Sequence, residues 1–349
     1  MTTKAHVAIN GFGRTGRQAF KAIWERHRDQ IEVAAIGLAD LEDASAAAHL
    51  LQYDSNYGRF GPTVEVRDHA LHVGDTRIPL VAADSLAGLP WRAHGVDIVI
   101  EASGRYERGA EARGHLEAGA RHVVITAPSD DADCTVIFGV NEADFDPSAH
   151  AIVSSGSDTT NALAPVLKVL NGDFPLKNAM LTAVRAYTNA QKLVDATDRD
   201  LRRARSAPTS IVPTTTRAAK AVAQVLPEVA GKVSGYAVRV PVPTVSFLEV
   251  TAQFEAPVAV EAINDAFRAA ARGPLGRVLA VSDAPLVSTD FRGNPNSAIV
   301  DAPFTMAIGP LAKVSAWYDN EYGYSNRVAD VVAHIAARTA GTARNGTTA

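Results

Sequence analysis

Residues 6–26 read "HVAINGFGRTGRQAFKAIWER" and contain the first structural unit of the chain. Their opening is a short apolar run typical of a buried strand. The chain then bends at two glycines and continues as an amphipathic helix. A second apolar strand, residues 31–40, follows and ends in an acidic residue. Strand, turn, helix and strand at this spacing predict a parallel sheet covered by helices on both faces.

The same alternation continues and then changes. Residues 96–104 and 121–129 read as further strands, and a helix is expected around Ala110 to Ala118. Residues 74–82 look like a minor hairpin insertion. From about residue 158 a helix (161–174) precedes longer alternating strands, which predict a mostly antiparallel sheet with one face buried. Those strands are expected at 178–188, 235–243, 244–256 and 312–321.

Two segments stand outside this pattern. Residues 188–210 are polar, basic and too irregular for a regular element, and loops of that length inside compact domains are usually functional or disordered. An amphipathic helix at 324–340 ends the ordered chain. The tail after it, residues 341–349, is expected to be flexible.

Bulk composition restricts the class of protein. The chain has 349 residues, which favours two domains. Its apolar fraction of 47% and charged fraction of 21% are typical of soluble globular proteins. A net charge of -4 argues against electrostatic capture of nucleic acid or an anionic membrane. No run approaches the roughly 20 apolar residues of a membrane span.

Cysteine and histidine usage restricts the possible disulfides and metal sites. The single cysteine, Cys134, excludes an internal disulfide, and the ten histidines are scattered without metal-ligand spacing. We therefore expect no metal site. The N-terminus leads straight into a strand and lacks the apolar core of a signal peptide, so a cytoplasmic location is expected.

Three glycines in the first strand-turn-helix unit form a nucleotide-binding motif. Gly11, Gly13 and Gly16 form G-x-G-x-x-G, which permits a tight turn and close approach of backbone to a pyrophosphate at the helix N-terminus. Asp40, at the end of the second strand, would accept hydrogen bonds from a ribose 2′-hydroxyl and repel a 2′-phosphate, so NAD is favoured over NADP. The alternatives are a glycine turn without nucleotide and, for Asp40, a solvated strand end.

Longer motifs carry a family resemblance. From about residue 5 to residue 338 the chain resembles phosphorylating glyceraldehyde-3-phosphate dehydrogenases. The resemblance implies a Rossmann NAD-binding domain (1–157, completed by the helix 322–340), a catalytic domain that binds substrate phosphate (158–321), and a homotetramer. The matching stretches are "INGFGRTGR" (9–17), "YDSNYGRF" (53–60), "TAPS" (126–129), "SDTTNALAP" (157–165), "RAYTNAQKLVD" (185–195), "RRARSAPTSIVPTTTRAAKAV" (202–222), "RVPVPTVS" (239–246), "VSTDF" (287–291) and "WYDNEYGYSNRV" (317–328).

The resemblance also assigns a cofactor site. Besides Asp40, Asn320 matches the family's asparagine that binds the nicotinamide carboxamide, and Tyr324 matches its neighbour. Ala39 departs from the asparagine common there, which should weaken adenosine binding modestly. The remaining cofactor positions are Gly11, Phe12, Gly13, Arg14, Thr15, Gly16 and Thr126.

Substrate-phosphate positions are present too. Thr188 and Arg239 match the pair that holds the substrate's phosphate, and Arg205 matches a second arginine. Arg217 departs from the family's glycine and adds a positive charge to that loop. Hydroxyls and guanidinium groups suit an anion, although an interdomain salt bridge is the alternative for Arg239. The matching hydroxyl donors are Ser157, Thr159 and Thr216.

The reacting pair, by contrast, is replaced. Asp158 stands at the position of the family's catalytic cysteine and Arg185 at that of its histidine, while the motif's second cysteine is Ala162. Cys134 is expected in a buried strand of the other domain and cannot substitute. A carboxylate is a poor nucleophile towards an aldehyde, and a guanidinium remains protonated, so the covalent route should be lost.

An ion pair between Asp158 and Arg185 is expected at the start of a helix. The arginine and the N-terminal amides of the helix both lower the pKa of the carboxylate, which makes Asp158 a weak base. Asp158 could still orient a hydroxyl, while Arg185 polarises a carbonyl or holds a carboxylate. Three functions follow: noncovalent hydride transfer between NAD and a phosphorylated small molecule, an inactive NAD- and sugar-phosphate-binding protein, or a non-redox reaction such as isomerisation. Several departures together favour natural divergence over an engineered change.

Overall fold

The computed structural model describes residues 4–342, which form two compact units. Within this range the first unit holds residues 4–136, 142–156 and 325–342, and the second holds 137–141 and 157–324. The short segment 137–141, expected with the first domain, thus belongs to the second. The final helix continues to Thr342, beyond the expected start of the tail, and residues 343–349 of that tail lie outside the described residues.

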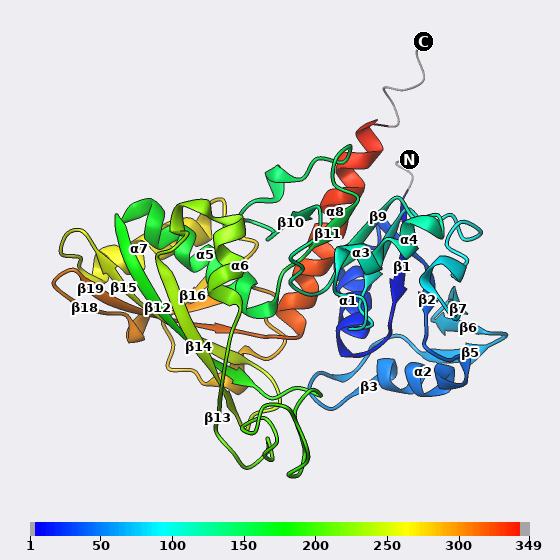
Figure 1. Cartoon of the computed structure of the whole chain (residues 1–349), viewed down its shortest axis with the longest axis horizontal. Coiled ribbons are helices and arrows are strands. Elements are labelled where there is room, and N and C mark those ends of the chain that lie inside the picture. Colours follow the sequence, from blue (N-terminus) through cyan, green and yellow to red (C-terminus); the bar gives the residue numbers. More distant parts are fainter. Residues whose placement is uncertain (1–3, 343–349) are drawn as a thin grey trace. The chain divides into compact units, whose positions relative to one another are not determined.

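A nine-stranded sheet forms the centre of the first unit (Figure 1). Its order is β10-β11-β9-β8-β1-β2-β7-β6-β5, and every pair from β10 to β7 is parallel. The predicted hairpin insertion is a three-stranded antiparallel meander whose last strand, β7, joins the main sheet beside β2. The strands are β1 (Ala5–Asn10), β2 (Ile31–Gly37), β5 (Val64–Arg67), β6 (Ala70–Val73), β7 (Thr76–Val81), β8 (Ile98–Glu101), β9 (His122–Ile125), β10 (Cys134–Thr135) and β11 (Ile152–Ser154), with a separate hairpin of β3 (Tyr53–Asp54) and β4 (Gly58–Arg59).

Helices of the first unit connect these strands. They are α1 (Arg14–Arg26), α2 (Ala44–Gln52), α3 (Gly109–Ala112), α4 (Gly114–Glu117) and α8 (Tyr322–Thr342), with the 3-10 turns η1 (Leu41–Asp43), η2 (Leu86–Gly88) and η3 (Glu142–Asp144). The helix predicted around 110–118 is confirmed in position, but it is interrupted at one residue, Arg113. It divides into α3 and α4, and Gly114 packs so closely that a Cβ there would lie 2.7 Å from Leu86 Cβ.

The last helix returns to the first unit by polar contacts with α1. Arg26 Nη1 donates to Asn326 Oδ1 at 3.1 Å, and His27 Nε2 lies 3.1 Å from Asp330 Oδ1. Both acceptors are almost fully buried. These contacts place the C-terminal helix against the helix that follows the glycine turn.

An eight-stranded sheet forms the second unit, in the order β13-β14-β12-β15-β19-β17-β16 with β18 beside β19. It is mostly antiparallel as predicted, but β12–β14 and β16–β17 are parallel. The strands are β12 (Leu176–Ala186), β13 (Val212–Thr214), β14 (Val233–Val240), β15 (Ser246–Phe254), β16 (Leu279–Ser282), β17 (Ala298–Asp301), β18 (Met306–Ile308) and β19 (Leu311–Tyr318).

Helices α5 (Asp158–Asp173), α6 (Ala218–Val225) and α7 (Val260–Arg272) pack on this sheet through a shared apolar core (Figure 1). Three 3-10 turns complete the unit: η4 (Pro227–Val229), η5 (Ser288–Phe291) and η6 (Ala302–Phe304). The segment 188–210 contains no helix or strand, as predicted. Burial of α5 along most of its length fixes its first residue, Asp158, relative to the strands beneath it.

Cys134 differs from its expected surroundings. Its strand, β10, has only two residues and lies at the edge of the sheet, and the cysteine is half-buried rather than enclosed in a core. Burial and the nearby carboxylates of Asp144 and Asp133 raise the pKa of its thiol, which keeps it protonated and weakly nucleophilic.

Candidate functional site

The glycine turn has the geometry that its sequence predicts. Gly11 has a φ of +90°, and a Cβ there would lie 2.5 Å from Ser103 backbone atoms; a Cβ at Gly16 would collide with the Gly11 carbonyl. Gly13, the N-cap residue of α1, faces open space. Because no side chain caps α1 and no acid stands in its first turn, its N–H groups remain available to an anion such as a pyrophosphate.

A pocket of about 460 Å³ lies beside this turn. It is built at the carboxyl ends of the parallel strands β1, β2, β7 and β8, where open α/β sheets bind ligands. Its walls combine apolar side chains with a few polar groups, as small-molecule sites do. The lining residues are Asn10, Gly11, Phe12, Gly13, Arg17, Leu38, Ala39, Asp43, Ala46, Ala47, Leu50, Ala83, Asp84, Ser85, Leu86, Leu89, Ala102, Ser103, Arg105 and Tyr106.

Other predicted cofactor residues are placed differently. Asp40 does not line the pocket, because its carboxylate caps η1 and accepts the Glu42 N–H at 2.9 Å. The Arg14 guanidinium pairs with Asp54 at 3.2 Å, and the Thr126 hydroxyl donates to the Glu101 carbonyl at 3.0 Å. Thr15 is half-buried in the first turn of α1. Sequence reasoning thus located the glycine turn but not the partners of these side chains.

A buried polar network behind the turn was missed. The Glu101 carboxylate accepts from Asn10 Nδ2 at 2.6 Å and lies 2.9 Å from His115 Nε2. Trp91 Nε1 donates to His115 Nδ1 at 2.9 Å, so the histidine proton lies on Nε2, facing the carboxylate. Asn10 immediately precedes Gly11, so the network fixes the start of the turn. The only sequence signal was an acid at the end of a buried strand.

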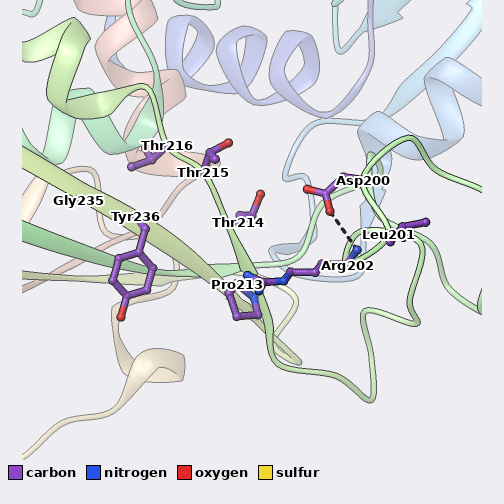
Figure 2. A pocket seen from close by; sticks show the side chains of 9 residues that line it. All are labelled: Asp200, Leu201, Arg202, Pro213, Thr214, Thr215, Thr216, Gly235 and Tyr236. Carbon is purple, nitrogen blue, oxygen red and sulfur yellow. Dashed lines mark hydrogen bonds between the residues drawn. The ribbon is translucent and has the colours of Figure 1, made fainter.

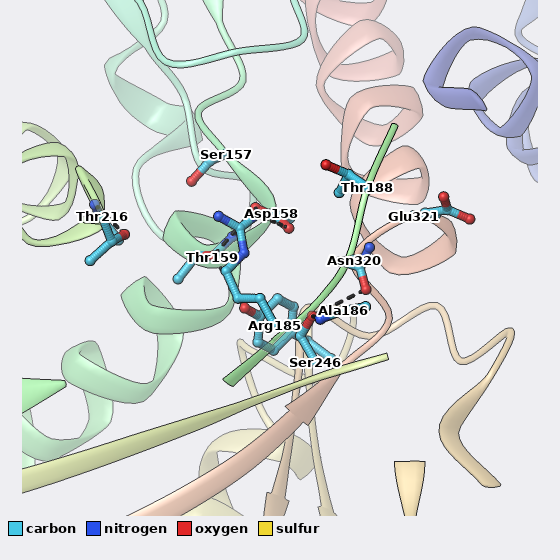
Figure 3. A network of polar contacts seen from close by, with 12 residues as sticks. Ser157, Asp158, Thr159, Arg185, Ala186, Thr188, Thr216, Ser246, Asn320 and Glu321 are labelled. Atoms are coloured by element: carbon cyan, nitrogen blue, oxygen red, sulfur yellow. Dashed lines mark hydrogen bonds and ion pairs between the residues drawn. The ribbon is translucent and has the colours of Figure 1, made fainter. Parts of the chain in front are cut away.

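In the second unit, Asp158 and Arg185 form the predicted ion pair (Figure 3). Arg185 Nη2 lies 2.6 and 2.5 Å from the two carboxylate oxygens. Asp158 is the first residue of α5, whose N-cap Ser157 accepts the Thr160 N–H at 3.1 Å. The Thr159 N–H donates to Asp158 Oδ1 at 2.7 Å and the Thr159 hydroxyl at 3.3 Å, so Oδ1 accepts from Thr159 as well as from Arg185.

A second arginine stands across from the pair. The parallel register of β12 and β14 sets Arg185 opposite Arg239, whose Nη1 donates to the Ala186 carbonyl at 2.8 Å. Burial, followed by the charge of Arg185, lowers the pKa of Arg239 to about 10. Burial opposes the charge of Arg185 itself, but Asp158 and the Tyr318 hydroxyl outweigh it and raise its pKa. Two guanidinium groups against one carboxylate leave a net positive site suited to an anion.

Hydroxyls connect this pair to Asn320. The Thr159 hydroxyl donates to Asp158, so the Tyr318 hydroxyl, 3.1 Å away, is the donor to Thr159. The pKa of Tyr318 is raised, chiefly by its complete burial. The Ser246 hydroxyl, which also hydrogen-bonds Tyr318, donates to Asn320 Oδ1 at 3.1 Å (Figure 3).

Ser246 and Tyr318 are functional candidates that the sequence did not reveal. The preceding residue, Val245, has a φ of +67°, which is strained for a β-branched side chain and is characteristic of functional sites. Tyr324 is buried in the first turn of α8.

In the described part of the chain, the remaining candidates for binding the substrate's phosphate make no hydrogen bond or ion pair with the Asp158–Arg185 pair. Thr188 is half-buried, and its N–H donates to Gln191 Oε1 at 3.2 Å. Arg205 pairs with Asp195 at 2.9 Å and is 64% exposed. Arg217 is exposed at the start of α6. Within residues 4–342, neither Arg205 nor Arg217 hydrogen-bonds to the Asp158–Arg185 pair.

Thr216 lines a separate open pocket of about 740 Å³ (Figure 2). The loop of Asp200, Leu201 and Arg202 forms one side, and Arg202 N–H donates to Asp200 Oδ1 at 2.9 Å. The other side comes from β13, β14 and the residues that follow β13, namely Pro213, Thr214, Thr215, Gly235 and Tyr236. Thr216 is therefore next to the irregular segment 188–210.

Two other kinds of feature are absent from the described part of the chain. No group of three or more His, Cys, Asp or Glu is placed there to hold a metal ion. No helix among residues 4–342 combines the length and apolar character needed to cross a bilayer.

Comparison with known proteins gives matches over both units. Residues 5–109 match the NAD-binding domain of glyceraldehyde 3-phosphate dehydrogenase, and residues 157–320 match its C-terminal domain. The chain is 48% identical to glyceraldehyde-3-phosphate dehydrogenase of Geobacillus stearothermophilus over 95% of this chain and 98% of that protein. It is 49% identical to the Kitasatospora aureofaciens enzyme over 95% and 99%, and 47% identical to enzyme 2 of Bacillus subtilis over 96% and 98%.

Proposed function

The chain belongs to the glyceraldehyde-3-phosphate dehydrogenase family of NAD-dependent oxidoreductases, and from that premise we propose that its chemistry is altered. The proposed reaction is hydride transfer between NAD and a phosphorylated small aldehyde, ketone or alcohol, without a covalent enzyme–substrate bond. One observation carries the proposal: the residue at the nucleophile position is Asp158, and it is ion-paired with Arg185.

The covalent route requires groups that this site lacks. A thiolate attacks an aldehyde readily, whereas the carboxylate of Asp158 is a poor nucleophile and is already held by three donor groups. Arg185 cannot remove a proton, because Asp158 and Tyr318 hold its pKa above the usual value. Cys134 lies in the first unit and keeps its proton.

The chain's own residues suit a noncovalent route. Arg185 carries a permanent positive charge and would stabilise negative charge on a substrate oxygen as it develops. Arg239, opposite it in register, and Thr188 would hold the substrate's phosphate. The glycine turn and its pocket would hold NAD, which accepts or supplies the hydride when bound.

A second function is favoured by a specific observation. Both oxygens of Asp158 are occupied by Arg185, and Thr159 adds two further hydrogen bonds. A carboxylate in this state neutralises the adjacent cation. The alternative is therefore a protein that binds NAD and a sugar phosphate without turnover, in a sensing or interaction role.

An absorbance screen separates the two functions. Formation or loss of NADH is followed by its absorbance, with phosphorylated aldehydes, ketones and hydroxy acids tested in both directions. Turnover that Arg185→Ala or Asp158→Ala abolishes, with NAD binding retained, supports the enzyme. Binding of NAD with no turnover of any substrate class supports the alternative.

A reversion tests the rest of the site. The double variant Asp158→Cys/Arg185→His restores the two reacting side chains of the family. If it oxidises glyceraldehyde 3-phosphate, the phosphate and cofactor positions are family-like. If it binds NAD but does not react, the substrate pocket has also diverged.

The assembly and the roles of the units remain part of the proposal. The first unit, which includes the helix from residue 325, would bind NAD, and the second would bind the substrate. A homotetramer in the cytoplasm is proposed from the family membership. Exposed apolar side chains in the second unit, including Leu201 and Ile211, support an assembly.

A further inference from the structure

We infer that Glu101, with His115 and Trp91 behind it, is a positioning group that sets the affinity of the glycine turn for the pyrophosphate of NAD. None of the three residues lines the cofactor pocket. Glu101 ends β8, His115 lies in α4, and Trp91 lies in the chain between η2 and β8. The inference concerns cofactor affinity, so it does not depend on whether or how the protein turns over a substrate.

Glu101 is a buried carboxylate with only donors around it. It is 2% exposed, and each of its two oxygens accepts two hydrogen bonds. Oε2 accepts from Asn10 Nδ2 at 2.6 Å and from His115 Nε2 at 2.9 Å. Oε1 accepts the Ser103 N–H at 2.8 Å and the Ser103 hydroxyl at 2.5 Å. Within the described residues no lysine or arginine pairs with this carboxylate.

A charge in this position is costly for the fold. Burying a carboxylate without a cation beside it opposes folding, and a well-packed apolar side chain would avoid that penalty. Proteins break such packing rules mainly at functional sites. The donors that surround Glu101 indicate which function it serves.

Two of these donor residues line the cofactor pocket. Asn10 ends β1 directly before Gly11, and Ser103 follows β8 by two residues. Gly11 packs on the second of them, since a Cβ at Gly11 would lie 2.5 Å from backbone atoms of Ser103. The Glu101 carboxylate thus holds together the two chain segments that meet at the glycine turn.

Trp91 and His115 support the carboxylate from behind. Because Trp91 Nε1 donates to His115 Nδ1 at 2.9 Å, the imidazole proton lies on Nε2 and faces Glu101. Both side chains are completely buried. Trp91 also packs in one apolar cluster with Leu86 and Leu89, which line the pocket. Support of this kind holds a binding group in its productive geometry.

Glu101 acts on NAD through geometry and not through attraction. A carboxylate repels a pyrophosphate, whereas the N–H groups at the start of α1, which no side chain caps, attract it. Those N–H groups bind well only when the turn already has its bound conformation, because ordering a loop during binding lowers the affinity. Removing the charge of Glu101 would therefore tighten binding if repulsion dominated, and it weakens binding if positioning does.

The test uses Glu101→Gln, Trp91→Phe and their combination in the full chain. Glutamine has the same shape but presents an NH2 group to one of the present donors, so part of the network breaks. Phenylalanine lacks the indole N–H, which lets the His115 proton move to Nδ1. The matched control is His27→Gln, because His27 is a second buried histidine of the first unit, 3.1 Å from the Asp330 carboxylate at the other end of α1.

Dissociation constants for NAD, ADP and adenosine are measured by calorimetry. ADP contains the pyrophosphate and adenosine does not, so only ADP depends on the glycine turn. Glu101→Gln should weaken NAD and ADP about tenfold and Trp91→Phe about threefold, as lost hydrogen bonds to a charged group predict. Adenosine should change less than about twofold, since it has no phosphate for the turn to hold. In the double variant, Trp91→Phe should add little, because both changes act through one carboxylate.

Four outcomes overturn the inference. They are ADP binding to Glu101→Gln that is as tight as in the wild type or tighter, equal weakening of ADP and adenosine, full additivity of the two changes, and an equal loss of ADP affinity in His27→Gln. Circular dichroism and thermal unfolding establish that each variant is folded at the temperature of measurement.

Trp91→Phe decides alone if Glu101→Gln does not fold. ADP affinity about threefold weaker with adenosine unchanged then supports the inference, and unchanged ADP affinity overturns it. Loss of turnover in a variant that keeps its ADP affinity bears on the proposed function and not on this inference.

Discussion

The Asp158–Arg185 pair has a stability consequence as well as a chemical one. Its side chains are only 11% and 17% exposed, so removing one partner leaves a partly desolvated charge. We expect Asp158→Ala to lower the free energy of unfolding by about 2 kcal/mol. Urea denaturation measures this loss. The double variant Asp158→Ala/Arg185→Ala should lose less than the sum of the single changes.

Arg205 and Asp195 provide a matched control at the same scale. They form an ion pair of 2.9 Å, but both side chains are about two-thirds exposed. Exposed pairs contribute about 0–1 kcal/mol, so Asp195→Ala should shift the unfolding midpoint little. Equal losses in Asp158→Ala and Asp195→Ala would show that the first pair is fully hydrated in solution.

At the scale of elements, α8 is attached to the first unit partly through titratable rings. His334 on α8 and His122 on β9 both pack against Phe145, with ring centroids 6.1 and 5.8 Å away. Burial lowers the pKa of both histidines below the ordinary value of 6.5. The unfolded chain therefore binds these protons more readily than the folded chain does.

The sign of the pH dependence follows from this difference. Stability contributed by the neutral histidines is present above pH 6.5 and is lost as the pH falls from 6.5 through the lower folded pKa values. We expect His334→Gln/His122→Gln to flatten the decline in unfolding free energy between pH 6.5 and 5. Denaturant titrations at several pH values measure it, with exposed His49→Gln as the control. An unchanged slope in the double variant would contradict the prediction.

Elements also show where sequence patterns stop being informative. The helix expected at 161–174 begins three residues earlier, at Asp158, although Ser157 followed by Asp158 and two threonines is an N-terminal signal that the sequence contains. The parallel pairing of β12 with β14 was not predictable, because alternation reports which residues face the core and not the direction of a neighbouring strand. The close approach of Leu86 to Gly114 in α4 was not predictable either, because the two residues are distant in sequence.

For the whole molecule, the residues of the candidate site and one of its contacts were predictable, and its other contacts were not. The family motifs identified Asp158, Arg185 and Arg239, and the ion pair between the first two is confirmed. The register that sets Arg239 opposite Arg185 comes from strand pairing, and the Tyr318 contact comes from β19. Asp40 illustrates the converse, because a local cap competes with the role that its motif assigns.

The proposed tetramer leads to the remaining prediction at this scale. Apolar side chains are unusually exposed in the irregular segment and just after it: Leu193 is 76% exposed, Leu201 82% and Ile211 70%. Burying one such side chain fully contributes about 1.5–3 kcal/mol, and three together would support a lasting contact between chains. We expect light scattering of the wild-type protein to give four times the mass of one chain.

Charged substitutions test whether this segment forms the contact. Leu201→Asp/Ile211→Asp would place two carboxylates in an apolar interface, where unpaired charges are strongly disfavoured. The mass should then fall to that of a dimer or a single chain at micromolar concentration, with the far-UV spectrum unchanged. Arg67→Asp, on the exposed strand β5 of the first unit, serves as the control and should leave the mass at four chains. If the Leu201→Asp/Ile211→Asp variant remains a tetramer, the exposed apolar segment does not form the contact between chains, because its side chains are then exposed to solvent in the tetramer as well.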